Sequence, residues 1–427
     1  MAMSTALLTD HYELTMVKAG LRSGAAHRRT VFEVFARHLP GGRRYGVVAG
    51  TGRLLDALEN FRFGEEELTF LEDKGIIDRP TLEFLADYRF SGNVYGYREG
   101  DLYFPASPIL VVEGTFAEAV VLETLILSIL NHDCAIASAA SRMTNAAAGR
   151  PIIEMGSRRT HEQAGVAAAR AAYVAGFAST SNLQAGRLYG VPTAGTAAHA
   201  FTLLHDSEKD AFQAQIDSLG PSTTLLVDTY DVAEAVRTAV ELAGNKLGAV
   251  RIDSGDLAVA AQEVREQLDA LGAFHTRIIV TSDLDEYAIA ALAAAPVDGY
   301  GVGTSLVTGS GVPTAALVYK LVARETASGR LEPVAKRSVG KPSRGGRKEA
   351  YRLLDSSGHI ETEVIATSGA VPEGGVPLLH PLVLNGEIVG REPLEAARER
   401  HRTTVATLPL DALHLARGYP AIPTEFI

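Results

Sequence analysis

A pattern of strand, acidic residue and helix recurs three times between Thr223 and Leu306, and it constrains the fold more than any other feature. The apolar runs LLVDTYD, AVRIDSGD and RIIVTSDLD each end in aspartates, and alanine-rich stretches with helical spacing follow them. A fourth run, DGYGVGTSL, ends in a glycine–threonine turn. Apolar strands alternating with helices are typical of parallel strands buried on both faces. In α/β barrels the carboxyl ends of such strands form the functional rim, so we expect the chemistry there.

Three more strands of the same kind precede this stretch, in RPIIEMGSRR, AYVAGFASTSN and YGVPTAGT. Together with the four above they make about seven parallel strands, one short of a complete eight-stranded barrel. The sequence therefore predicts an incomplete α/β barrel over residues 131–335.

The flanking residues have a different character. Between Phe90 and Gly114, short strands with regular Gly and Pro punctuation predict antiparallel sheet. This assigns 1–130 to a separate N-terminal domain. Residues 336–427 begin with a basic, Gly-rich loop and continue as short strands and a helix, which we expect to pack back on the N-terminal domain and make it discontinuous. The loop (336–348) either is simply solvated or closes over an anionic substrate.

Composition narrows the class of protein. The net charge of -11 argues against general binding to nucleic acid or to anionic membranes. The single cysteine, Cys134, rules out an intramolecular disulfide framework and a multi-cysteine zinc site. There is no secretory leader pattern, and the apolar stretches are interrupted short of the roughly 20 residues that span a bilayer. We therefore expect a cytoplasmic enzyme without a membrane segment.

His199 is the first candidate for chemistry. It follows GVPTAGTAA, in which Thr196 is a good helix N-cap, so we expect it in the first turn of a helix. The free N–H groups and positive dipole end of such a turn favour an anion, and a histidine there is suited to carry a phosphoryl group. The alternative is a hydrogen-bonded core histidine.

Arginines and glycine-rich turns supply candidates for anion binding. Arg158 and Arg159 end the strand PIIEMGSRR, where at most one would reach the barrel mouth directly, although a strand-to-helix turn relaxes this limit; a surface ion pair is the alternative. Arg251 and Asp253 either pair with each other or, with the turn that follows them, form a polyhydroxyl and phosphate pocket. The turn after Asp253 contains Ser254 and Gly255. A second glycine-rich turn, with Gly303 and Thr304, follows a later strand.

Eight ordered motifs are similar to those of the nicotinate phosphoribosyltransferase family along nearly the whole chain: TDHYELTM, FEVFARHLPGG, EMGSRR, FASTSN, GTAAHAF, VRIDSGDL, TSDLDEY and GVGTSLVT. The resemblance implies a type II phosphoribosyltransferase, with a discontinuous α/β sandwich domain joined to an incomplete seven-stranded barrel. It implies an ATP-dependent ligase that condenses nicotinate with 5-phosphoribosyl 1-diphosphate into nicotinate mononucleotide and diphosphate. It also implies a phosphohistidine, a homodimer with a shared active site, and Mg²⁺ that enters with the diphosphate rather than in a dedicated protein cage.

The resemblance also implies roles for single residues. His199 corresponds to the phosphorylated histidine, Arg158 lies near the pyridine carboxylate, and Tyr12, from the partner subunit, stacks against the ring. Phe35, Arg159 and Arg251 are further members of the pocket. Asp253 binds the ribose hydroxyls beside Ser254 and Gly255. The phosphate is held by Ser282, Gly303 and Thr304, and we add Thr196 and Asp283 to the substrate-binding set.

Ser181, in FASTSN, bears on the choice of base. Relatives that use nicotinamide place an aspartate at this position, where it accepts hydrogen bonds from the amide; a neutral serine does not repel a carboxylate. The sequence therefore favours nicotinate. Met155 stands where those relatives carry an aromatic residue that sandwiches the ring, which leaves the second stacking partner unassigned.

Four rival interpretations remain. A nicotinamide phosphoribosyltransferase conflicts with Ser181, and a quinolinate enzyme needs no ATP-linked histidine, so GTAAHAF argues against it. A non-catalytic binding protein on the same scaffold predicts losses among the site residues, yet all are present. An aldolase needs a Schiff-base lysine at a strand end, and none of the expected strands ends in one.

Overall fold

The computed structural model describes residues 4–336, 343–367 and 369–427, so part of the basic loop expected at 336–348 lies outside it. The chain forms two compact units: a discontinuous unit of residues 1–138 and 312–427, and a central unit of residues 139–311. Residues 312–335, expected in the barrel, belong to the discontinuous unit. The reason is that β12 (Leu317–Glu325) pairs antiparallel with β1 (Arg29–Ala36) along its length.

One parallel sheet organises the central unit. Its six strands lie in the order β7-β6-β11-β10-β9-β8, and every pairing is parallel. In chain order they are β6 (Ile152–Glu154), β7 (Ser179–Thr180), β8 (Thr224–Leu226), β9 (Ala249–Ile252), β10 (Arg277–Val280) and β11 (Gly299–Val302). The strand expected in YGVPTAGT is reduced to a single parallel bridge between Thr180 and Thr193. Pro192 has no N–H to donate to a ladder, which explains the interruption. An incomplete parallel sheet is thus present, but its seventh strand is not.

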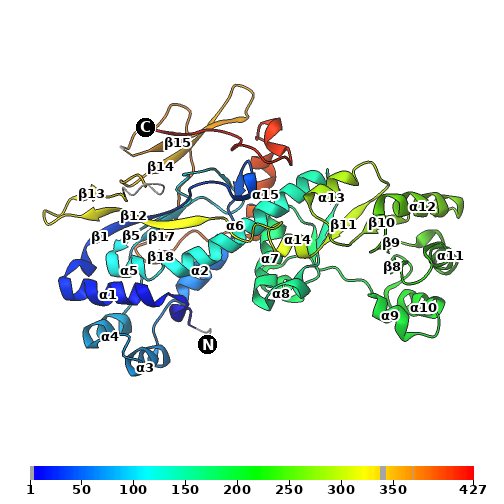
Figure 1. Cartoon of the computed structure of the whole chain (residues 1–427), viewed down its shortest axis with the longest axis horizontal. Coiled ribbons are helices and arrows are strands. Elements are labelled where there is room, and N and C mark those ends of the chain that lie inside the picture. Colours follow the sequence, from blue (N-terminus) through cyan, green and yellow to red (C-terminus); the bar gives the residue numbers. More distant parts are fainter. Residues whose placement is uncertain (1–3, 337–342, 368) are drawn as a thin grey trace. The chain divides into compact units, whose positions relative to one another are not determined.

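Helices connect these strands. They are α7 (Glu162–Val174), α8 (Leu183–Tyr189), α9 (His199–Leu204), α10 (Glu208–Leu219), α11 (Val232–Ala243), α12 (Leu257–Ala270), α13 (Glu286–Ala291) and α14 (Thr304–Val307). In Figure 1, α10, α11 and α12 follow one another alongside strands β8 to β10, and α11 contacts both of its neighbours. Asp231, Asp256 and Asp285 cap α11, α12 and α13 through their side chains. The second aspartate of each recurring motif therefore starts a helix, which leaves the first for the site.

Antiparallel sheet dominates the discontinuous unit, as the spacing of Gly and Pro predicted. The largest sheet has seven strands in the order β13-β12-β1-β5-β3-β17-β18. Its strands besides β1 and β12 are β3 (Asn93–Gly96), β5 (Leu110–Thr115), β13 (Leu331–Pro333), β17 (His380–Leu384) and β18 (Glu387–Ile388). Smaller sheets are formed by β2 (Gly46–Val47) with β4 (Leu102–Tyr103), and by β14 (Glu349–Leu354), β15 (Ile360–Ala366), β16 (Val376–Pro377) and β19 (Thr424–Phe426).

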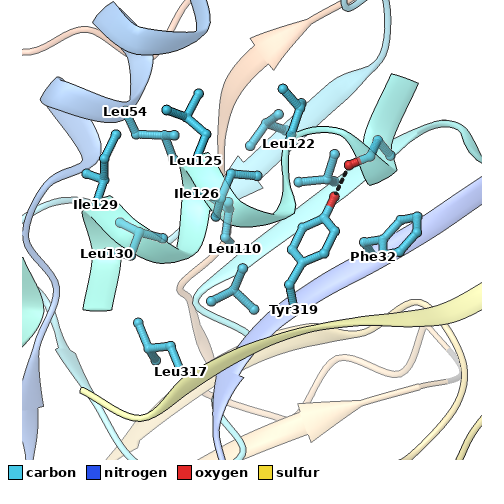
Figure 2. Close-up of a cluster of buried hydrophobic side chains, with 14 of the residues drawn as sticks. Phe32, Leu54, Leu110, Leu122, Leu125, Ile126, Ile129, Leu130, Leu317 and Tyr319 are labelled. Carbon is cyan, nitrogen blue, oxygen red and sulfur yellow. Dashed lines mark hydrogen bonds between the residues drawn. The ribbon is translucent and has the colours of Figure 1, made fainter. Parts of the chain in front are cut away.

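Helices of the discontinuous unit enclose its core. They are α1 (His11–Ser23), α2 (Thr51–Glu59), α3 (Glu65–Asp73), α4 (Arg79–Ala86), α5 (Phe116–Val120), α15 (Leu394–Val405) and the first part of α6 (Glu123–Ala146). Figure 2 shows leucine and isoleucine side chains of α6 in the same apolar cluster as Phe32 and Tyr319. The two rings stack with centroids 4.7 Å apart, and the Tyr319 hydroxyl donates to the carbonyl of Ala119 at 2.9 Å. Residues from both ends of the chain thus share one core.

One helical stretch, 116–146, has the length and apolar composition of a membrane span. The sequence did not predict this, because the Glu, His and Asp residues in its apolar stretches were interpreted as interruptions. The most apolar part of the stretch is 67% buried within the protein. Burial of this extent is typical of the core helix of a globular domain, and Cys134 lies within it, fully buried.

Candidate active site

A pocket of about 220 Å³ lies at the carboxyl ends of strands β6, β9, β10 and β11. It is lined by Met155, Arg158, Arg159, Asp253, Thr281, Ser282, Asp283, Gly301, Gly303 and Thr304. All except Met155, Thr281 and Gly301 are among the predicted site residues. A cavity of about 680 Å³ in the discontinuous unit contains none of them. The expected rim of the parallel sheet is therefore a pocket of arginines, acids and glycine turns.

Both arginines of the EMGSRR motif line this pocket, although we expected at most one to reach it directly. Strand β6 ends at Glu154, and Ser157–Arg159 forms a 3-10 turn rather than a continuation of the strand. Alternation across a strand therefore does not apply to Arg158 and Arg159. Gly156 is required at the start of this turn, because a side chain there would meet Val307 Cγ1 at 2.3 Å.

The end of β10 carries backbone strain. Ser282 has φ 141°, a conformation that favours glycine, and it lines the pocket beside Asp283. Strain of this kind costs about 1–3 kcal/mol and concentrates at functional sites.

The absence of a side chain at Gly301 allows Thr281 and Met155 to approach closely, since a Cβ would lie 2.5 Å from Thr281 Cγ2.

His199 is the first residue of α9, as the sequence predicted, but Thr196 is not its N-cap. The N-cap is Ala198, which has no side chain to accept a hydrogen bond. Thr196 instead accepts a hydrogen bond from the guanidinium of Arg251 at 2.6 Å. This bond ties the segment before α9 to strand β9. The pKa of Arg251 is lowered because its guanidinium is largely buried.

Two carboxylates face the imidazole of His199. Its Nε2 lies 3.8 Å from Asp228 Oδ1 and 3.9 Å from Asp253 Oδ2, and its Nδ1 lies 3.2 Å from the Thr229 hydroxyl. The imidazole is 40% exposed, so it is not a buried core histidine. Asp253 also accepts a hydrogen bond from Thr281. Asp253 also lines the pocket, so His199 lies next to one of the pocket's carboxylates.

Other predicted residues lie outside the lining of this pocket. Tyr12 and Phe35 belong to the discontinuous unit, on α1 and β1. Tyr12 is 46% exposed and hydrogen-bonded to Glu123, and burial with nearby acids raises its pKa, whereas Phe35 is buried. Ser181 is exposed and immediately follows β7. Ser254 and Gly255 form the turn after β9, where Gly255 has φ 82°.

Sequence reasoning missed three polar residues around the site: Glu154, Thr229 and Thr281. Asp228 ends the strand run LLVDTYD, as Asp253 ends AVRIDSGD, so the repeated pattern placed it on the rim, but it gave Asp228 no role. Its carboxylate is 3% exposed, and Oδ1 makes no hydrogen bond among the described residues. Burial raises the pKa of Glu208, and the nearby charges of Asp228 and Asp231 add to this effect.

The donor set of the pocket suits Mg²⁺ that arrives with a diphosphate. Mg²⁺ is usually bound through one or two carboxylates and substrate phosphates. Asp253 and Asp283 supply two carboxylates on the pocket wall, and the Asp253 side chain is 41% exposed. Across the described residues, no group of three or more His, Cys, Asp or Glu side chains could hold a metal ion. Asp253 and Asp283 are therefore the candidate carboxylate ligands for such an ion.

Comparison with known proteins identifies the family. Residues 7–131 match the nicotinate phosphoribosyltransferase (NAPRTase) N-terminal domain, and residues 151–361 match the nicotinate phosphoribosyltransferase (NAPRTase) family. Nicotinate phosphoribosyltransferase pncB1 of Mycobacterium tuberculosis is 58% identical over 99% of this chain and 95% of its own length. The structure of human nicotinic acid phosphoribosyltransferase has a TM-score of 0.84 and 26% identity over 98% of this chain and 97% of its own. The structure of nicotinate-nucleotide pyrophosphorylase from Pyrococcus furiosus has a TM-score of 0.76 and 27% identity over 94% of this chain and 95% of its own. The chain belongs to the nicotinate phosphoribosyltransferase family.

Proposed function

We propose that this protein condenses nicotinate with 5-phosphoribosyl 1-diphosphate, releasing nicotinate mononucleotide and diphosphate in NAD biosynthesis. The observation that carries the proposal is the meeting of Arg158, Asp253, Ser282 and Thr304 in one pocket. These residues come from four separate motifs in a chain that is 58% identical to a nicotinate phosphoribosyltransferase. The pocket offers cations for carboxylate and phosphate together with an acid for ribose hydroxyls.

Three groups of pocket residues suit three parts of the substrates: the nicotinate carboxylate, the ribose hydroxyls and the phosphate. The guanidinium of Arg158, with Arg159 beside it, provides a planar fork for the nicotinate carboxylate. Asp253 is placed to accept hydrogen bonds from ribose hydroxyls. The turn at Gly303 and Thr304 begins helix α14, and with Ser282 it offers N–H and hydroxyl donors to the phosphate.

Catalysis in this pocket consists mainly of positioning. Departure of diphosphate leaves an oxocarbenium-like anomeric carbon, which the pyridine nitrogen attacks in line. Bound Mg²⁺ would neutralise the diphosphate oxygens, with Asp253 and Asp283 as its protein ligands.

We further propose that His199 carries a transient phosphoryl group taken from ATP. The imidazole stands beside Asp228 and Asp253, and the Thr229 hydroxyl lies at its Nδ1. A phosphoryl group there would change the charge and shape of the site beside Asp253 and thereby couple ATP hydrolysis to substrate binding.

We also propose that the active unit is a homodimer in which Tyr12 of one subunit completes the pocket of the other. Tyr12 is an exposed aromatic residue in the discontinuous unit, whereas the pocket belongs to the central unit. A ring of this kind gains about 0.5–1.5 kcal/mol from stacking on an aromatic base.

The test is product formation from phosphoribosyl diphosphate with nicotinate or nicotinamide, each with and without ATP. We expect mononucleotide to form from nicotinate but not from nicotinamide, at a rate that ATP raises. Product from nicotinamide would identify a different base, and product from neither would favour a binding protein on this scaffold.

A further inference from the structure

Glu154 is a buried carboxylate at the end of strand β6, beside the pocket but not in its lining. Its side chain is 0% exposed. One carboxylate oxygen accepts a hydrogen bond from the backbone N–H of Gly156, and the other accepts one from the hydroxyl of Thr180. No cation pairs with it among the described residues, and burial raises its pKa. Because an unpaired buried carboxylate costs free energy, its presence calls for an explanation beyond packing.

The two residues that Glu154 binds begin the two turns that carry the expected base-recognition residues. Gly156 precedes the 3-10 turn of Arg158, and Thr180 precedes Ser181. The same turns are joined twice more. Ser181 N–H donates to the Glu154 carbonyl at 2.8 Å, and Asn182 Nδ2 donates to Ser157 Oγ at 2.9 Å. The spacing between the Arg158 turn and the Ser181 turn is therefore set by hydrogen bonds that centre on Glu154.

Thr180 also connects this network to the segment that leads to His199. Its N–H donates to the Pro192 carbonyl and its carbonyl accepts from Ala194 N–H, both at 2.9 Å. These bonds replace the missing seventh strand of the sheet. The Glu154–Thr180 pair is thus the junction at which β6, β7 and the segment before α9 meet.

We propose that Glu154 is a positioning residue that holds the Arg158 turn against the Ser181 turn and thereby sets the affinity of the pocket for the carboxylate-bearing ring. The inference rests on the proposed function, because it assigns these two turns to the base. Glu154 itself lies outside the pocket lining; it acts by fixing two turns, of which the first carries Arg158 into that lining.

Replacement of Glu154 by glutamine tests the carboxylate at constant size. The N–H of Gly156 cannot accept a hydrogen bond, so the substituted amide must turn its oxygen toward it. Its NH₂ group then faces the Thr180 hydroxyl, which already accepts Asn182 N–H at 2.9 Å. The link from β6 to β7 is weakened while the link to Gly156 remains.

The experiment compares initial rates of wild type, Glu154→Gln and Thr180→Val at varied nicotinate and varied phosphoribosyl diphosphate. We expect the KM for nicotinate to rise about tenfold in both variants, the equivalent of one lost hydrogen bond. The KM for phosphoribosyl diphosphate and kcat should change much less. Thr180→Ser keeps the hydroxyl and should restore the wild-type KM. Glu363→Gln is the matched control, since Glu363 is a fully buried carboxylate that accepts hydroxyls of Tyr97 and Ser107 in the discontinuous unit.

An unchanged KM for nicotinate in folded Glu154→Gln and Thr180→Val would overturn the inference, as would an equal rise in Glu363→Gln. If Glu154→Gln does not fold, the contrast between Thr180→Val and Thr180→Ser decides. The wild-type reaction separates the two proposals: no product from nicotinate in wild type overturns the proposed function and this inference with it, whereas normal wild-type turnover with unchanged variants overturns the inference alone.

Discussion

Asp228 holds the Asp253 turn in place: its Oδ2 accepts the backbone N–H of Asp253 at 2.8 Å and the hydroxyl of Ser254 at 2.7 Å. The other oxygen, Oδ1, lies 3.8 Å from His199 Nε2. One buried carboxylate therefore links the residue proposed to bind ribose with the residue proposed to carry the phosphoryl group. Its position at the end of β8, beside β9 in the sheet, makes both contacts possible.

Replacing Asp228 by asparagine should lower kcat/KM for phosphoribosyl diphosphate about 30-fold, equivalent to about 2 kcal/mol, because hydrogen bonds to a charged acceptor are replaced by weaker ones. Steady-state rates measure the effect. Asp231→Asn is the control, since Asp231 caps helix α11 nearby. Equal activity in the two variants would show that Asp228 does not organise the turn.

His199→Ala should leave a folded protein that forms some mononucleotide but no longer responds to ATP. The reason is that the imidazole is the proposed phosphoryl acceptor, whereas the pocket residues stay in place. Product formation with and without ATP is the measurement. His205→Ala, at the other end of the same short helix, should keep the ATP response. An ATP response in His199→Ala equal to that of wild type would remove the phosphohistidine from the mechanism.

Ser181→Asp should raise the KM for nicotinate at least about fivefold, since it sets a like charge against the carboxylate at a cost of about 1 kcal/mol or more. Ser181→Asn provides a neutral side chain of the same size and should have a smaller effect. The two variants are compared with nicotinate and nicotinamide as substrates. If nicotinate use is the same in both, Ser181 does not face the base.

Lys348→Met should destabilise the protein by about 3–5 kcal/mol, because it leaves a buried carboxylate without its cation. Lys348 Nζ lies 2.7 Å from Glu33 Oε2, and the two side chains are 2% and 3% exposed. Denaturant unfolding followed by circular dichroism measures the loss. The double variant Lys348→Met with Glu33→Leu should recover much of it, and a double variant that is less stable than the single one would contradict this account.

Stability should fall as the pH drops below about 6.5, in part because of His401. Burial lowers the pKa of His401 to about 4, so the folded protein keeps it neutral while the unfolded chain takes up a proton. The stability that the neutral His401 contributes is fully present above the pKa of histidine in the unfolded chain. It is lost as the pH falls toward the lower pKa of His401 in the folded protein. Between pH 6.5 and 5 the loss is about 2 kcal/mol. His401→Gln should show a shallower pH dependence of the unfolding midpoint, and an unchanged slope would exclude this role.

Local patterns in the sequence are enough to locate most of the pocket. Arg158, Asp253, Ser282 and Thr304 each follow from their place at the end of a strand, because parallel strands bring their carboxyl ends to one edge. Glu154 and Thr180 cannot be found in this way. Their importance arises from hydrogen bonds between strands, and a single sequence does not show which side chains face each other across a sheet.

The sequence by itself determined the family, the parallel sheet with its rim of acids and glycine turns, and His199 at the start of a helix, because hydrophobic periodicity and ordered motifs are local properties of the chain. Only the tertiary structure decided the rest. It reduced the seventh strand to one bridge at Thr193, since Pro192 cannot donate to a ladder. In the folded chain Thr196 is a hydrogen-bond partner of Arg251 rather than an N-cap, and residues 312–335 belong to the discontinuous unit. Each of these outcomes depends on which hydrogen-bond partner a backbone or side-chain group finds at long range, and that competition is settled only when the whole chain has folded.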